Sequence, residues 1–154
     1  MPGLGINALH HACSFVHLAN STITPKLEGL SDDRVIPPEA RVPSLAFTVL
    51  NAGDNINSVP DLAVVSFDRR IVPSETLAEA RQQIFDVLNA MKKTPEFAEL
   101  NYEYKEDYVT EATWVDPDQL ISRVFQDAIK VVTGQEAGIV ASPGTDDQIG
   151  RAHV

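Results

Sequence analysis

The sequence has a single cysteine, Cys13, so no disulfide can form within the chain. So little cysteine is typical of a reducing compartment, and we expect a cytoplasmic protein. The first residues carry no basic stretch followed by an apolar run, so no secretory signal is expected there.

Long apolar runs and basic clusters are missing too. No run approaches the roughly 18 apolar residues that a membrane-spanning helix needs. Lysine and arginine number 12 against 22 aspartates and glutamates, which gives a net charge of −10. Such a chain repels nucleic-acid phosphates and anionic lipids, so neither nucleic acid nor a membrane is an expected partner. With 154 residues, 44% of them apolar, it is typical of a globular protein with one ordinary core.

The hydrophobic pattern predicts a mixed α+β protein. Apolar residues at helical spacing predict three helices, which begin near residues 5, 73 and 116. The second helix opens with Thr76 and Glu79 at the spacing of a capping box, and Gly134 ends the third. Alternating or apolar runs predict strands at residues 44–50, 62–70, 100–108 and 137–141.

The order of the first five elements is helix, strand, strand, helix, strand. This order matches the split β-α-β unit of a ferredoxin-like fold without its first strand. We therefore expect an antiparallel sheet with two helices on one face and the first strand missing, followed by a further helix and strand. The missing strand would be a central one, so its neighbours would lack backbone partners.

The most specific pattern lies in the second predicted strand and the turn before it. Asn57 is followed by Val59-Pro60, and the strand ends in Asp68-Arg69-Arg70. The flanking motifs are Gly5-Ile6-Asn7-Ala8, Pro73 with Glu75, and Gly144-Thr145-Asp146-Asp147. In this order, these motifs resemble the lid and dimerisation domain of zinc-dependent N-acyl amino acid deacylases, the metallopeptidase-like family of acetylornithine deacetylase and succinyl-diaminopimelate desuccinylase.

The resemblance implies that the matching Asn57 and Arg70 bind the α-carboxylate of an N-acyl amino acid substrate. It also gives Thr145 and Asp147 a place in the active site. Arg70 suits its role, because a guanidinium can hold a carboxylate through two parallel hydrogen bonds. The simpler interpretation of Arg70 is a surface ion pair with Asp68.

The resemblance further implies two metal ions, zinc or cobalt, in the full-length enzyme, where they activate water for amide hydrolysis. The family's metal ligands and general base have no counterpart in this sequence. We therefore expect neither catalytic nor metal-ligating residues here, and no activity from the chain alone. The resemblance also implies a homodimer that forms through the lid.

The motifs divide the chain into three parts. We expect residues 1–110 to be an N-terminally truncated lid and dimerisation domain, and residues 111–148 to start the C-terminal part of the catalytic domain. Residues 149–154 depart from the family pattern. Their sequence is a possible translation of a common sequencing adaptor, so we expect these six residues to be an artefact.

Two other interpretations stay open. In the first, the chain is a non-catalytic α+β dimerisation module. In the second, it is a module that binds a small molecule without catalysis. His10, His11 and His17 lie on the first predicted helix without an acidic partner at metal-ligand spacing, so we expect exposed or packed side chains. Cys13 falls on the apolar stripe of that helix and is expected in the core.

Overall fold

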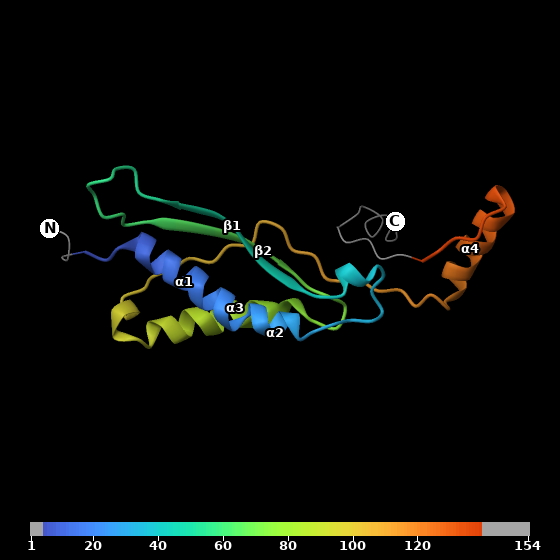
Figure 1. Cartoon of the computed structure of the whole chain (residues 1–154), viewed down its shortest axis with the longest axis horizontal. Helices are drawn as coiled ribbons and strands as arrows, with labels where there is room; N and C mark the ends of the chain where they lie inside the picture. The colour runs from blue at the N-terminus through green and yellow to red at the C-terminus, as the bar shows by residue number, and fades with distance from the viewer. Residues whose placement is uncertain (1–4, 140–154) are drawn as a thin grey trace.

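The computed structural model describes residues 5–139, which form an α+β protein as the sequence predicts. The helices are α1 (Ala8–Thr22), α2 (Thr24–Glu28), α3 (Leu77–Lys92) and α4 (Leu120–Thr133). The strands are β1 (Ser44–Ala52) and β2 (Ala63–Arg70), and short 3-10 turns lie at Pro38–Ala40 and Pro95–Phe97. Figure 1 shows a long hairpin above a helical layer, with α4 apart at one end.

The two strands form an antiparallel hairpin. Its register pairs Ser44 with Arg70 and Ala52 with Ala63, and a bulge lies between Phe47 and Val49. The turn at the tip begins at Gly53, whose φ of 70° is a conformation that glycine adopts without strain. The start of β1 and the end of β2 therefore lie together, far from the turn.

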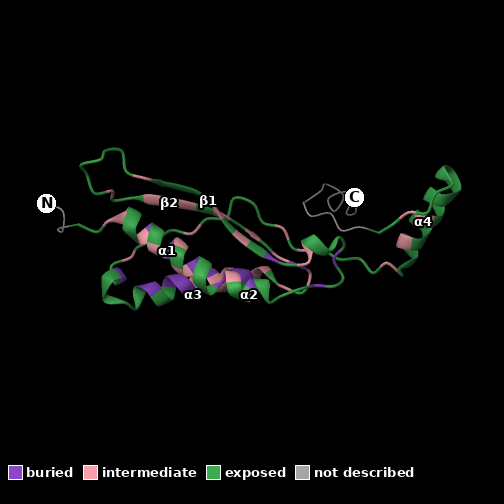
Figure 2. Cartoon of the chain, viewed as in Figure 1, coloured by how far each residue is buried: buried purple, intermediate pink, exposed green. Residues whose placement is uncertain are grey.

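Helices α1 and α3 cover one face of the hairpin, and the core lies between the two layers (Figure 2). Apolar side chains of both strands point to this face because residues two apart share a side of a strand. Phe47 makes edge-on and tilted ring contacts with Phe15 of α1 and Phe67 of β2, at 5.7 and 5.6 Å between centroids. We call residues 7–106, which hold both layers, the two-layer unit.

Helix α3 begins at the predicted capping box, with Thr76 as its N-cap, and not at the expected opening near residue 73. The Thr76 hydroxyl accepts a hydrogen bond from the Glu79 backbone N–H at 3.2 Å, and the Glu79 carboxylate accepts one from the Thr76 N–H at 2.9 Å. These hydrogen bonds complete the predicted capping box. The Thr76 backbone N–H, followed by the Thr76 hydroxyl, which donates to the same carboxylate at 2.8 Å, lowers the pKa of Glu79 because both favour its charged form.

The expected strand at residues 100–108 is wrong: this segment is extended but pairs with no strand. In a ferredoxin-like sheet its partner would be the strand that precedes α1, and none of residues 5–139 takes that position. Side chains hold the segment on α3 instead. Arg81 donates to Glu106 at 2.7 and 2.8 Å, and Tyr104 packs edge-on against Phe85. Burial, followed by the hydrogen bond to Glu106, raises the pKa of Tyr104 to about 12.

Cys13 is exposed, which corrects its expected place in the core. Helix α1 buries Ala12, Phe15 and Ala19 instead. The large ring of Phe15 sets which side faces the sheet, because it fills the space above Phe47. Cys13 is adjacent to the buried Ala12, and helical spacing alone does not separate the centre of a buried stripe from its margin.

Helix α4 lies away from the two-layer unit (Figure 1). It ends at Gly134, as predicted, with a φ of 73°. None of its residues is buried, and its large apolar side chains are exposed, among them Leu120, Ile121 and Phe125. The strand expected at 137–141 is not formed at residues 137–139, and its remainder lies outside the described residues.

The loop after α2 is organised by Asp32, whose side chain is 3% exposed. Its carboxylate accepts hydrogen bonds from Arg34 Nε at 2.8 Å, Arg34 Nη2 at 2.6 Å and the Arg34 backbone N–H at 3.1 Å. The Asp32 backbone N–H donates to the carbonyl of Arg41 at 3.0 Å. The Arg34 side chain is the main cause that lowers the pKa of Asp32 to about 2.

We expect Asp32 to stabilise the protein in a pH-dependent way. Its folded pKa of about 2 lies below the ordinary 3.8, so its contribution is present above about pH 4 and is lost as the pH falls from there towards 2. Asp32→Asn should lower the free energy of unfolding by on the order of 1 kcal/mol at pH 6, and by much less at pH 2.

Urea unfolding of both proteins at the two pH values measures this difference. Asp33→Asn is the control, because the neighbouring Asp33 side chain is 91% exposed. An Asp32→Asn deficit that is equally large at pH 2 and pH 6 would contradict the role given to the carboxylate charge.

Candidate substrate-binding site

Arg70 is the last residue of β2, and its side chain is 64% exposed. Its Nε donates to Asp68 Oδ2 at 2.8 Å, which is the ion pair that the simpler interpretation expects. This contact raises the pKa of Arg70 above its ordinary value, so the guanidinium stays charged. Its terminal nitrogens make no hydrogen bond to residues 5–139, so an anion can approach them from solvent.

The neighbouring Arg69 is buried, with a side chain that is 7% exposed. Its Nη2 donates to Glu75 Oε1 at 2.6 Å and to Gln83 Oε1 at 3.1 Å, and its Nη1 donates to the carbonyl of Arg70. Glu75 Oε2 also accepts the backbone N–H of Val72 at 3.4 Å. Arg69 and Glu75 thus hold the backbone on both sides of the Arg70 side chain.

Sequence reasoning did not single out Arg69, although a signal was present. Val65, Phe67 and Arg69 alternate along β2 on the side that faces the helices. An arginine that continues an inward apolar series must be paired, since an isolated buried charge is very costly. Glu75, noted only as part of a motif, is the partner.

Asn57 lies in the exposed turn between the strands. Two motifs that are distant in sequence meet below this turn. The backbone N–H of Ala8 donates to the carbonyl of Pro60 at 3.0 Å, while the Asn7 side chain caps α1 by accepting the His10 N–H at 3.2 Å. The first motif therefore fixes the base of the turn that carries Asn57.

The structure does not bring Asn57 and Arg70 together. Ala63 and Arg70 are the ends of β2, and seven residue steps at about 3.4 Å each put roughly 24 Å between them. Asn57 belongs to the turn between Ala52 and Ala63, which is beyond the Ala63 end of β2. Figure 1 shows this turn at the far end of the hairpin. Asn57 and Arg70 of one chain therefore cannot bind the same carboxylate.

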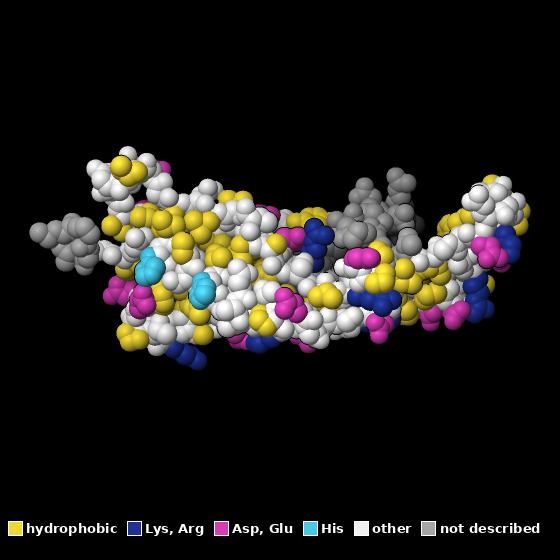
Figure 3. Space-filling model, viewed as in Figure 1, with side chains coloured by type: hydrophobic (Ala, Val, Ile, Leu, Met, Phe, Trp, Pro, Cys, Tyr) yellow, Lys and Arg dark blue, Asp and Glu magenta, His cyan; other side chains and the backbone are white. Residues whose placement is uncertain are grey.

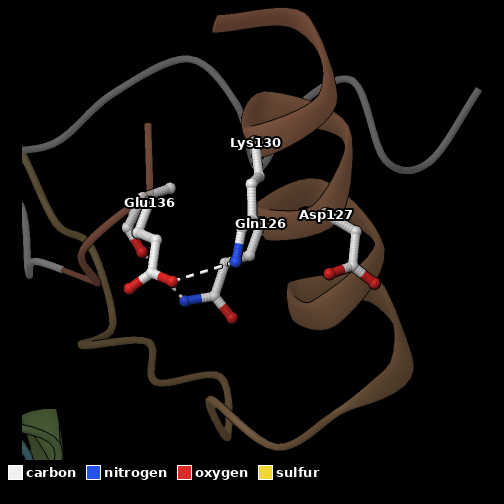
Figure 4. Close-up of a pocket in the computed structure, with 5 residues that line it drawn as sticks. Gln126, Asp127, Lys130 and Glu136 are labelled. Carbon is white, nitrogen blue, oxygen red and sulfur yellow. Dashed lines mark hydrogen bonds and ion pairs between the residues drawn. The ribbon is translucent and has the colours of Figure 1, made fainter. Parts of the chain in front are cut away.

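Two cavities among the described residues lie elsewhere. One, of about 360 Å³, is lined by Leu30, Ser74, Glu75, Glu79, Gln82, Gln83 and Asp86. The other, of about 190 Å³, lies beside α4 (Figure 4), where Lys130 pairs with Glu136 at 2.9 Å and Gln126 donates to the carbonyl of Ala137. The acidic groups of the first cavity repel a carboxylate, and the lysine of the second is already paired with Glu136, so neither suits the substrate's acid group.

The histidines of α1 are packed or exposed, as expected. His11 makes an edge contact with Phe97 at 5.0 Å, and His10 lies 3.6 Å from Glu96. Histidine side chains lie on the surface over α1 in the view of Figure 3. Thr145 and Asp147, the remaining candidates, lie outside the described residues.

The family model of the M20 peptidase dimerisation domain matches residues 1–96. The chain belongs to this family. Neither a curated protein nor a solved structure matches the chain. The matched range includes the hairpin and the helices that cover it, so the M20 dimerisation domain and the two-layer unit largely coincide.

M20 peptidases are hydrolases and are generally metal-dependent. The described residues can therefore be compared with what a metal site needs. No group of three or more His, Cys, Asp or Glu side chains in residues 5–139 could hold a metal ion. The described part of this M20 dimerisation domain therefore does not fit a catalytic metal. None of its helices has the length and hydropathy to span a membrane.

Proposed function

We propose that this M20 dimerisation domain belongs to a metal-dependent hydrolase that removes an N-acyl group from an amino acid or a peptide-like substrate. The family match supports the hydrolase class, and Arg70 supports the substrate class. We further propose zinc or cobalt at a site outside the described residues, a cytoplasmic location from the single cysteine, and a homodimer formed through this domain.

Arg70 is the observation that carries the proposal. An exposed, permanently charged guanidinium at the end of a strand is a suitable receptor for a substrate carboxylate. Buried contacts of Arg69 fix the backbone that carries it, so little conformational freedom is lost when a ligand binds. Binding energy at this remote carboxylate would position the scissile amide in the catalytic domain.

The distance between Asn57 and Arg70 determines how the two subunits of a dimer would form one substrate site. One chain cannot place both side chains on one carboxylate, whereas a two-fold dimer can bring the hairpin turn of one subunit to the strand end of the other. We infer that each substrate site uses Arg70 of one subunit and Asn57 of the other. The exposed turn around Asn57 is available for this contact.

Mixed dimers of the full-length hydrolase test this arrangement. Asn57→Ala and Arg70→Ala should each inactivate homodimers, because every site loses one carboxylate ligand. When the two variants are unfolded and refolded together, half of the dimers are hybrids, and each hybrid has one intact site. We expect hydrolysis of an N-acetyl amino acid to recover to roughly a quarter of the wild-type rate.

Each variant refolded alone is the control and should stay inactive. No recovery in verified hybrids would show that Asn57 and Arg70 do not meet across the dimer. Full activity of the Arg70→Ala homodimer would remove Arg70 from substrate binding altogether.

A further inference from the structure

Trp114 is 42% exposed and stacks on a cationic side chain of the two-layer unit. The Arg34 guanidinium carbon is 5.3 Å from the centre of the Trp114 ring. Trp114 belongs to residues 107–119, which we call the linker because they connect the two-layer unit to α4. The contact thus joins the loop after α2 to the segment that leads away from the unit.

Arg34 is held in place from the other side. Its Nε and Nη2 both donate to the buried carboxylate of Asp32, at 2.8 and 2.6 Å. The backbone N–H of Asp32 donates to the carbonyl of Arg41 at 3.0 Å, which fixes Asp32 in turn. Two parallel hydrogen bonds set the plane of the guanidinium, and its face is left free to stack on an aromatic ring.

The linker contributes nothing to the core of the two-layer unit. The buried cluster and the partly buried residues packed on it end, in sequence, at Tyr104. The last ion pair with α3 is made by Glu106. The folding of the unit therefore does not depend on where the linker lies, and the position of the linker does depend on contacts such as that of Trp114.

We infer that the Arg34–Trp114 contact fixes the linker on the two-layer unit and so sets the direction in which the chain leaves for α4. Loss of the contact frees the linker and leaves the unit folded. The inference goes beyond the proposed function and does not rest on it, because it concerns the orientation of the segment after the M20 dimerisation domain and not the substrate site.

Backbone 15N relaxation of the whole chain tests the inference. We expect Trp114→Ala to lower the order parameters of the linker amides towards the flexible range, below about 0.6, while those of α1 and α3 stay near about 0.85. Val115→Ala is the matched control, since Val115 is adjacent and exposed. Trp114→Phe keeps an aromatic face and should restore most of the order.

Three results would overturn the inference. Unchanged order parameters of the linker in Trp114→Ala are the first, and an equal decrease for Val115→Ala is the second. A decrease throughout α1 and α3 is the third, because it would assign Trp114 to the packing of the unit.

Fluorescence gives a second measurement, since Trp114 is the only tryptophan of the chain. Arg34→Lys keeps the charge beside Asp32 but loses the planar group that stacks. We expect acrylamide to quench Trp114 about twofold more strongly in Arg34→Lys than in the wild type. Arg123→Lys, which changes an exposed arginine of α4, should leave quenching unchanged. Equal quenching in all three proteins would contradict the contact.

Discussion

Arg69→Met is expected to lower the free energy of unfolding by about 3–5 kcal/mol, a large part of the total stability of a small domain. The substitution keeps the length and apolar stem of the side chain but leaves Glu75, 8% exposed, without its cation. Gln83 loses its donor as well. The cost comes mainly from the carboxylate that stays buried and unpaired, not from the loss of an attractive pair.

Urea unfolding followed by far-ultraviolet circular dichroism measures this change. Arg70→Met is the matched control, because the adjacent arginine is 64% exposed and its loss should leave the free energy of unfolding nearly unchanged. The double variant Arg69→Met with Glu75→Leu removes both charges and should recover most of the lost stability. A double variant no more stable than Arg69→Met would refute the unpaired carboxylate as the cause.

The sequence predicts those parts of the fold that local patterns determine. The capping box at Thr76 and Glu79, the hairpin strands and the end of α4 at Gly134 each depend on residues close together in the chain. The strand ending at Arg70 shows the limit of this reasoning. Alternation places Arg69 inward, but only the fold brings Glu75 and Gln83 around it.

Features that depend on distant neighbours were not predictable in the same way. Residues 100–108 have the composition of a strand, but an extended segment becomes a strand only when a partner satisfies its backbone. The distance between Asn57 and Arg70 is a second example. Arg70 follows Asn57 by thirteen positions in the sequence, and the hairpin extends that interval over the length of β2. A family motif identifies candidate residues without showing whether one chain can bring them together.

Ile84→Ala is the second substitution with a large expected effect, a loss of about 2–5 kcal/mol in the free energy of unfolding. Ile84 is 2% exposed and lies on α3 in the core between the helices and the sheet. Truncation removes apolar contacts and leaves a cavity that α1 and the strands can only partly close. Urea unfolding measures the loss, and a change below about 0.5 kcal/mol, the usual effect of a surface substitution, would contradict this core.

Ile121→Ala in α4 is the matched control, because it makes the same truncation in a helix where the side chain is 54% exposed. Unfolding of the two-layer unit should not respond to it. A contiguous exposed apolar face such as that of α4 is typical of an interaction surface, so any effect should appear in association. Sedimentation of wild type and Ile121→Ala at several concentrations separates the two effects: Ile84→Ala changes unfolding at every concentration, whereas Ile121→Ala can change only the balance between monomer and assembly.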